Sequence, residues 1–175
     1  MSTSREKPPL TWPQRLRRWS LQGLALLLLL WAMEYVLTFN MIHGQAPNFA
    51  VTLLSGEQTP LHRPGSSPKL LHFWAEWCGI CALEHGSIQA IAADHEVITI
   101  AMQSGSPAEV RDFMQSEDIN YPTVADPNGR IAEHYGVSAV PASFILDADN
   151  NIRFVTRGYT SETGLRLRLW LASWW

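Results

Sequence analysis

The chain has 175 residues, a formal net charge of −3 at pH 7 and only two cysteines. The near balance of charge gives no basic face of the kind that binds nucleic acid, so we expect no nucleic-acid partner. Two cysteines are too few for a scaffold held together by disulfides, whereas 46% hydrophobic residues suffice for the core of about one domain.

The first 39 residues differ in composition from the rest of the chain. Residues 1–19 are polar and contain proline, and their basic residues outnumber the single acid Glu6: Arg5, Lys7, Arg15, Arg17 and Arg18. Residues 20–39 are apolar, with Glu34 as their only charge. A helix needs about 20 apolar residues to cross the hydrocarbon layer of a membrane. We therefore expect a single transmembrane anchor at residues 20–39, with Glu34 near the interface.

The direction of insertion follows from the basic flank. By the positive-inside rule, residues 1–19 form a cytoplasmic tail and the rest of the chain is exported. A cleaved signal peptide is the alternative, but its apolar core is usually about 7–15 residues long, and Pro47 after Ala46 leaves no good cleavage site. We expect a single-pass protein of the bacterial inner (cytoplasmic) membrane. A linker at residues 40–46 then leads to a periplasmic domain at residues 47–175.

Residues 47–175 alternate between strand-like and helix-like patterns. Strands are expected at the following segments: 49–54, 59–62, 69–75, 96–102, 121–126, and both sides of a turn at 149–151 within 142–158. Helices are expected at the following segments: Cys78 or Gly79 to about Ala93, 106–117, part of 126–136, and 161–175. The second of these has a serine N-cap with Pro107 and Glu109 after it. Strands that alternate with helices predict an α/β sandwich with a mixed sheet.

The two cysteines, Cys78 and Cys81, stand three positions apart. Such a pair can be a redox centre, a structural crosslink or half of a metal site. A crosslink over so short a loop stabilises a fold only weakly. At the start of a helix, backbone N–H groups and the helix dipole stabilise a thiolate, which is the reactive form of cysteine. We therefore expect Cys78 to attack, Cys81 to be the shielded resolving sulfur, and Trp77 to provide an apolar docking surface.

Two stretches carry a resemblance to a known family. FWAEWCGIC, residues 73–81, resembles the active-site segment of thioredoxin-fold proteins, and GVSAVPASFILD, residues 136–147, resembles the loop that carries their cis-proline. The resemblance implies that Pro141 follows a cis peptide bond beside the cysteines. It also implies that the backbone of Val140 pairs with the substrate chain.

The chain is also similar to a narrower group, the membrane-anchored TlpA/ResA-like disulfide oxidoreductases, which includes cytochrome c maturation thiol reductases and copper-sensitivity suppressors. The similarity covers residues 46–172. It rests on the anchor, the APNF start of the hairpin, the additional strand and helix at 96–122, and Glu84 in CxxCxxE spacing. It implies a thioredoxin-like sandwich with an N-terminal hairpin and one inserted strand–helix unit. The implied partners are exported protein thiols or disulfides and a membrane thiol electron donor, with no cofactor besides the redox-active Cys78–Cys81 disulfide.

Three positions depart from the family pattern. Gly86 stands where the narrower group usually has proline, and His72 stands where thioredoxins bury an aspartate. The interior of the CxxC motif is Gly79-Ile80 rather than Gly-Pro, so Ile80 is the third departure. Because these interior residues help to set the reduction potential, the potential cannot be copied from a relative.

Two side chains are candidates for moving the proton of the second cysteine. From the alignment we expect the His72 ring to lie under the cysteine pair, uncharged because burial disfavours the charged form. It either exchanges a proton with Cys81 or is a packed core histidine. Glu84 is either the proton acceptor for Cys81 or an exposed acid of the first helical turn.

A metal site is the competing interpretation of the cysteines. His85 could join His72 and both cysteines in a tetrahedral site, or the two thiolates alone could hold copper(I). The competing function is a membrane-tethered copper or zinc carrier. The spacing matches no common zinc finger, so we expect no metal site. The other histidines are expected at the surface or in loops: His43, His62, His95 and His134.

The predicted C-terminal helix and its end carry three tryptophans, Trp170, Trp174 and Trp175. Trp170 is expected to pack on the sheet. The last two either pack as well or dock at the membrane interface, where tryptophan is enriched.

Overall fold

The computed structural model describes residues 12–63, 65 and 67–175, without the side chains of 13–17, 34 and 37. The following residues with predicted roles lie outside this description, in full or in their side chains: Arg5, Glu6, Lys7, Arg15, Arg17 and Glu34. The chain divides into two compact units between Leu37 and Thr38. Each unit is described by itself.

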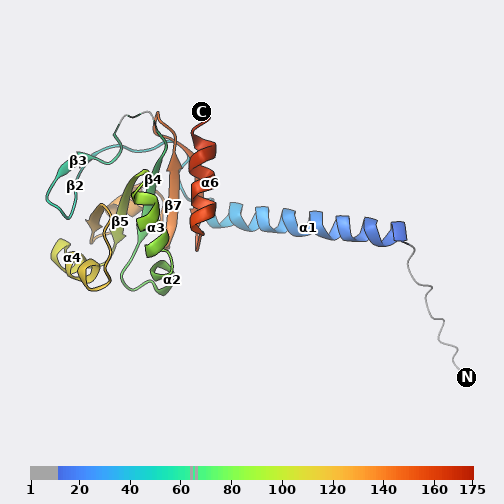
Figure 1. Ribbon diagram of the computed structural model, residues 1–175, viewed down its shortest axis with the longest axis horizontal. Helices are drawn as coiled ribbons and strands as arrows, with labels where there is room; N and C mark the ends of the chain where they lie inside the picture. The colour runs from blue at the N-terminus through green and yellow to red at the C-terminus, as the bar shows by residue number, and fades with distance from the viewer. Residues whose placement is uncertain (1–11, 64, 66) are drawn as a thin grey trace, which may run out of the picture. The chain divides into compact units, whose positions relative to one another are not determined.

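The first unit contains all but the last residue of the helix α1 (Trp12–Thr38), which is 27 residues long (Figure 1). The helix begins before the expected anchor at 20–39, within the segment assigned to the basic tail. The leucines of Leu26–Leu30 are all more than half exposed, and Trp31 stacks on Tyr35. Over the part of the chain that the structure describes, no helix is both long and apolar enough to span a membrane.

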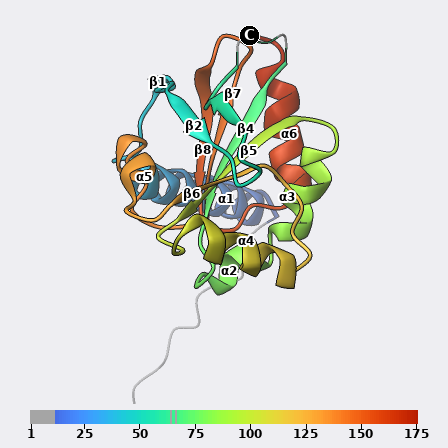
Figure 2. The ribbon, with the colours of Figure 1, turned by 90° about the vertical axis from the view of Figure 1, so that its left-hand side faces the viewer.

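The second unit is built on a six-stranded mixed sheet (Figure 2). Its strands are, in spatial order, β1 (Gly44–Gln45), β8 (Asn151–Arg157), β7 (Ala142–Leu146), β4 (Lys69–Trp74), β5 (Glu96–Met102) and β6 (Thr123–Asp126). The central strand β4 runs parallel to β5 and antiparallel to β7. Strands β2 (Ala50–Thr52) and β3 (Gln58–Pro60) pair antiparallel in a separate hairpin. The predicted α/β fold with a mixed sheet and an N-terminal hairpin is therefore confirmed.

Helices cover both faces of the sheet (Figure 2). The helices of this unit are α2 (Gly79–Ala82), α3 (His85–Ala92), α4 (Pro107–Ser116), α5 (Arg130–His134) and α6 (Glu162–Ala172). The face with Trp74 packs against α3, α4 and α6 and includes both cysteines. The face with Phe73 packs against α5 and the hairpin. Because side chains alternate along a strand, His72 lies on the same face as Trp74 and hence on the side of the cysteines.

The segment 40–46, expected to be a linker, belongs to the folded unit instead. Its last part forms β1, which pairs with the start of β8. Met41 and Ala46 are buried in the core, at 5% and 4% exposure. Pairing of β1 with the edge of β8 and burial of these apolar side chains explain why the segment is ordered. The folded domain therefore begins near Thr38 rather than at Pro47.

The helix predicted over residues 78–93 is interrupted after α2 and resumes with α3. At the interruption the amide N–H of Leu83 donates to the Ile80 carbonyl at 3.2 Å. The amide N–H of Glu84 donates to the Cys81 carbonyl at 2.9 Å. Bonds of this spacing tighten the chain relative to an α-helix. The tightened turn directs the Glu84 side chain into the core, where the residue is 1% exposed.

Two other side chains are placed differently from the expectation. His62, expected at the surface, is 2% exposed, and its ring nitrogen is hydrogen-bonded inside the core. Trp170, expected to pack on the sheet, is 56% exposed. Helix α6 covers the sheet with Leu165, Leu169 and Ala172 instead. Residues three and four positions apart share one side of a helix, and Trp170 falls on the other side.

Replacement of Gly136 by alanine should destabilise the domain strongly. Gly136 has a φ of +66°, and an added Cβ would overlap the carbonyl oxygen of Asn40. Gly56 provides a matched control, because its φ of +90° imposes similar backbone strain, but apart from its two chain neighbours no described residue comes within 4 Å of its added Cβ. Urea unfolding should show a loss of about 1 kcal/mol for Gly56→Ala and a loss larger by at least about 2 kcal/mol for Gly136→Ala. Equal losses would contradict the packing of Asn40 on Gly136.

Candidate active site

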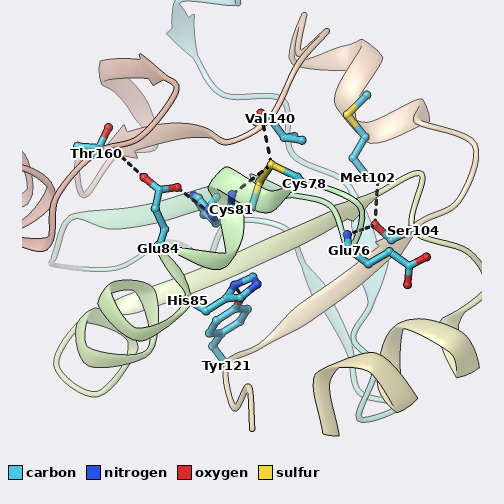
Figure 3. The surroundings of a disulfide bond; sticks show 11 residues. Glu76, Cys78, Cys81, Glu84, His85, Met102, Ser104, Tyr121, Val140 and Thr160 are labelled. Carbon is cyan, nitrogen blue, oxygen red and sulfur yellow. Dashed lines mark hydrogen bonds and ion pairs between the residues drawn. A yellow bond between two sulfur atoms is a disulfide. The ribbon is translucent and has the colours of Figure 1, made fainter. Parts of the chain in front are cut away.

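Cys78 and Cys81 form a disulfide where the central strand gives way to a helix (Figure 3). Strand β4 ends at Trp74, and Cys78 is the N-cap of α2. The pair therefore lies at the end of a fully buried strand, just where the chain reaches the surface. The strand–turn–helix context expected from the sequence is present.

The two cysteines differ in their access to solvent. Cys78 is 8% exposed, whereas Cys81 has no exposed surface (0%). The amide N–H of Cys81 donates to Cys78 Sγ at 3.2 Å. A partner protein can therefore reach only Cys78, and this N–H favours negative charge on the Cys78 sulfur once the disulfide is reduced.

The helix that begins after Cys78 is too short to supply the dipole expected from the sequence. Helix α2 contains only four residues, so few peptide dipoles are aligned behind the sulfur. The single amide N–H of Cys81 is the local group that takes over this role. The tight turn after Cys78, and not a long helix, sets the electrostatics at the sulfur.

Apolar side chains surround the accessible cysteine. Trp77, Ile80 and Leu83 are each more than half exposed. The indole N–H of Trp77 donates to the Gln103 carbonyl at 3.1 Å, which fixes the ring although it remains open to solvent. The surface around Cys78 is thus suited to an apolar segment of a partner.

The loop before β7 lies against the same sulfur. The Val140–Pro141 peptide bond is cis. The carbonyl oxygen of Val140 lies 3.6 Å from Cys78 Sγ, as Figure 3 shows. The amide N–H of Gly158 donates to the Pro141 carbonyl at 2.8 Å, so the segment after β8 supports the loop.

Glu84 is buried beside the cysteine pair. The residue is 1% exposed, so the alternative of an exposed acid in the first helical turn is wrong. One carboxyl oxygen accepts the amide N–H of Thr160 at 2.5 Å, as Figure 3 shows. The other oxygen has no hydrogen-bond partner among the described residues. Burial raises the pKa of Glu84 to about 7, although the Thr160 hydrogen bond opposes the shift.

His72 has no exposed surface (0%), as the alignment predicted. Its Nδ1 is hydrogen-bonded to the Ser143 hydroxyl at 3.0 Å. Its Nε2 lies 3.9 Å from Oε2 of Glu84, and neither atom has a hydrogen-bond partner in the described part of the chain. Burial, with a smaller contribution from nearby His85, lowers the pKa of His72 to about 3. The ring is therefore neutral at physiological pH, and its role in proton transfer stays a prediction.

Comparison with known proteins places the chain in a family. The sequence pattern of the AhpC/TSA family matches residues 42–155. The chain belongs to the AhpC/TSA family. As a member of this family, it places its cysteine pair at the end of the central strand of a thioredoxin-like sheet.

Three similar proteins illustrate the relationship of this AhpC/TSA member. A thioredoxin-like protein of Haemophilus influenzae is 35% identical over 108 residues, covering 61% of this chain and 64% of that protein. The thiol-disulfide oxidoreductase ResA of Bacillus thuringiensis is 30% identical over 123 residues, covering 63% of this chain and 66% of that protein. The chain thus spans just under two thirds of the length of these relatives. The crystal structure of the exposed lipoprotein thioredoxin Etrx1 of Streptococcus pneumoniae shares the fold, with a TM-score of 0.65, 23% identity, and coverage of 71% of this chain and 99% of that chain.

The sequence did not predict the roles of two residues of the site, Ser143 and Thr160. Ser143 holds the His72 ring and stands opposite it in the register of β4 and β7. The register could have predicted this contact had the antiparallel pairing been known. Thr160 binds Glu84 through its backbone N–H, a group that every residue except proline carries. No side-chain signal could have predicted that bond.

The predicted alternative of a four-ligand metal site is not formed in this AhpC/TSA member. In the described ranges no three or more histidine, cysteine, aspartate or glutamate side chains lie close enough together to hold a metal ion. His85 is turned toward Tyr121, to whose hydroxyl it is hydrogen-bonded at 2.8 Å. The centres of its ring and of the Trp74 ring lie 5.3 Å apart, with the two rings nearly perpendicular. His85 is thus a packing residue beside the site.

The buried Glu84–His72 pair predicts opposing effects of pH on stability. With pKa values of about 7 for Glu84 and about 3 for His72, the folded pair holds one proton, on Glu84, between these values. The unfolded values are 4.5 and 6.5. The raised pKa of Glu84 makes stability fall as pH rises from 4.5 to 7, and the lowered pKa of His72 makes it rise with pH up to 6.5. In the wild type these slopes, each about 1.4 kcal/mol per pH unit, cancel over most of this window.

Replacing either Glu84 or His72 should leave only the other residue's effect of pH on the free energy of unfolding. Relative to the wild type, Glu84→Gln should gain free energy of unfolding as pH rises from 4.5 to 7. His72→Leu should lose it, relative to the wild type, as pH rises toward 6.5. Urea unfolding of the oxidised proteins across this range measures both. Buried His62, with its pKa lowered to about 4, is common to all three proteins and cancels in the difference. Parallel curves would contradict the placement of the proton on Glu84.

Proposed function

We propose that the chain is a membrane-tethered thiol–disulfide oxidoreductase that acts on exported proteins through Cys78 and Cys81. The observation that carries the proposal is the asymmetric disulfide. One cysteine is 8% exposed beside the cis Val140–Pro141 bond, and the other has no exposed surface (0%). A relative named thiol-disulfide oxidoreductase ResA supports the same chemistry. The cysteine pair is itself the redox group, so the reaction needs no diffusible cofactor.

The first step joins the protein to its substrate. In the reducing direction, the Cys78 thiolate attacks one sulfur of a substrate disulfide and forms a mixed disulfide. The other substrate sulfur leaves as a thiolate and takes up a proton. The backbone of Val140 aligns the substrate chain, and Trp77 offers an apolar face to it.

The second step releases the substrate. Cys81 gives up its proton and attacks Cys78 Sγ, so that the Cys78–Cys81 disulfide forms and the second substrate sulfur leaves. Two electrons have then passed from the cysteine pair to the substrate disulfide, which becomes a dithiol. The same steps in reverse oxidise a substrate dithiol. A membrane thiol donor is the partner that would return electrons to the pair for another round of reduction.

Glu84 is the proposed acceptor for the Cys81 proton. Cys81 has no exposed surface (0%), so a buried group is needed to take its proton. A pKa of about 7 lets Glu84 accept and return a proton near neutral pH. His72, 3.9 Å from the carboxyl group, is the proposed neutral neighbour of this acid: its pKa of about 3 keeps the proton on Glu84.

The membrane anchor is part of the proposal and is supported by the character of α1. Consecutive leucines Leu26–Leu30 cover every side of a helix with about 3.6 residues per turn, and all of them are exposed. Over these five residues α1 is apolar on every side, a pattern found in protein cores and in membrane spans. The basic residues before the apolar run favour a cytoplasmic N-terminus. The domain would then lie on the periplasmic side of a bacterial inner membrane.

Substitution of the resolving cysteine should trap the partners. Cys81→Ser should accumulate mixed disulfides, because no second sulfur is present to resolve them. Cys78→Ser is the matched control and should accumulate none, since it lacks the accessible sulfur. Non-reducing gels of acid-quenched, alkylated cells measure both variants, and the added bands should disappear with reductant. Equal trapping by the two variants would refute the division of roles.

The purified chain should also reduce insulin disulfides in the presence of dithiothreitol, and both serine variants should lose this activity. This assay separates the proposal from the alternative of a metal carrier. Tight zinc or copper(I) binding without insulin reduction would favour the carrier and overturn the oxidoreductase.

The proposed orientation predicts where a fused reporter is active. Alkaline phosphatase fused after Trp175 should be active, because its disulfides form only outside the cytoplasm. The same enzyme fused after Ser20, before the apolar run, should be inactive. Phosphatase assays on whole cells measure both fusions. The reverse pattern would place the domain in the cytoplasm and remove exported proteins as its substrates.

A further inference from the structure

Helix α6 presents an apolar face that the described domain does not cover. Leu167, Trp170 and Trp174 are 54%, 56% and 72% exposed. Leu167 and Trp170 are three positions apart and share one side of the helix, and Trp174, in the turn just after the helix, continues this stripe by ring contact with Trp170. Leu165 and Leu169, which pack on the sheet, lie on the opposite side. The helix is thus apolar on two sides, and the fold uses only one of them.

The aromatic rings extend this face to the end of the helix. The rings of Trp170 and Trp174 lie 5.4 Å apart, edge to face. Trp175 is 59% exposed and packs on Phe154 of β8. The guanidinium group of Arg153 lies 5.4 Å from the centre of the Trp175 ring. The face therefore combines three large aromatic rings with a guanidinium group whose charge is paired with Asp147 at 2.7 Å.

The chemistry of the face is apolar and weakly basic. Between Leu167 and Trp175 the only charged side chain is Arg168, which donates to the Gly164 carbonyl at 3.0 Å. Tryptophan rings favour the membrane–water interface, where the ring meets hydrocarbon and the indole N–H meets headgroups or water. Nearby basic side chains favour anionic lipids.

We propose that this face, formed by Leu167, Trp170, Trp174 and Trp175, docks the domain on an anionic phospholipid bilayer beside its own anchor. The proposal rests on the anchor proposed above. It adds a second attachment, which would hold the redox domain against the membrane surface.

The short connection between the apolar run and strand β1 favours the bilayer, rather than a soluble partner, as the surface that the face binds. Strand β1 begins at Gly44, only a few residues after Phe39, and the stretch between them spans at most about 17 Å. A domain held so close meets the bilayer at high effective concentration, so a modest apolar face suffices. Strand β1 pairs with β8, and Trp175 packs on Phe154 of the same strand. The connection and the aromatic face therefore share one edge of the sheet.

Quenching of tryptophan fluorescence by lipid tests the proposal. The full chain and the double variant Trp170→Gln/Trp174→Gln are reconstituted, one copy per nanodisc, in phosphatidylcholine and phosphatidylglycerol with brominated acyl chains. The chain has eight tryptophans. If Trp170 and Trp174 touch lipid, removing them should lower the quenched fraction of the emission. If they face water, removing them raises that fraction, because only unquenched emission is lost.

Trp77→Gln is the matched control. Trp77 is 60% exposed, similar to Trp170, but it belongs to the surface around Cys78. Its removal should raise the quenched fraction, which shows that the sign of the change reports the position of the ring. Unchanged insulin reduction by the double variant confirms that its fold is intact.

The outcomes separate the docking face from the anchor. Alkaline carbonate should fail to extract the chain from vesicles of the same lipids, and release would overturn the anchor and the docking proposal with it. If the chain resists extraction but the quenched fraction rises in the double variant, the docking proposal is wrong and the anchor is unaffected. The oligomeric state in detergent is the last measurement. If the wild type is a dimer and the double variant is a monomer, the face binds a second copy of the chain, and docking on the bilayer is overturned.

Discussion

The buried carboxyl group of Glu84 is the constraint on which the rest of the site depends. A carboxyl group without access to water must lose its charge or find compensating partners. Here its pKa rises to about 7, and one oxygen accepts the Thr160 N–H. The tightened turn between α2 and α3 points the side chain inward, and the segment before α6 covers it. An uncharged His72 on the other side is compatible with a protonated neighbour. The interrupted helix, the covering segment and the neutral imidazole thus form one arrangement.

The same burial divides the two sulfurs into different chemical environments. Cys78 meets solvent, the cis Val140–Pro141 bond and a rim of apolar side chains. Cys81 meets only the core and the acid that lies one turn further along. In the proposed reaction, partner proteins approach the first sulfur while the proton of the second stays inside the protein. The protein can then accept varied partners without exposing its proton-transfer groups to them.

Local patterns in the sequence predicted most of the fold. The capping box of Ser106 and Glu109 and the Ser161 cap set helix starts that the structure confirms, because caps depend on neighbours in the chain. The break at Glu84 could not be predicted, because it depends on tertiary burial of one side chain. Strand β1 has only two residues, too few to show the alternating pattern of a strand. Thr160 contacts Glu84 through its backbone N–H, which leaves no trace in the sequence. His72 was placed by family alignment, and no periodicity would have distinguished it from another buried strand residue.

Short segments pair with part of the sheet at both of its sides. Strand β1 pairs along β8, and beside β6 the amide N–H of Leu54 donates to the Thr123 carbonyl at 2.8 Å. Open strand edges allow the sheets of neighbouring molecules to join and to aggregate. If the chain is confined to a membrane surface as proposed, its copies meet far more often than they would in solution. The short pairings at Asn151 and Ile152 and at Thr123 then shorten the open strand along which crowded domains could join.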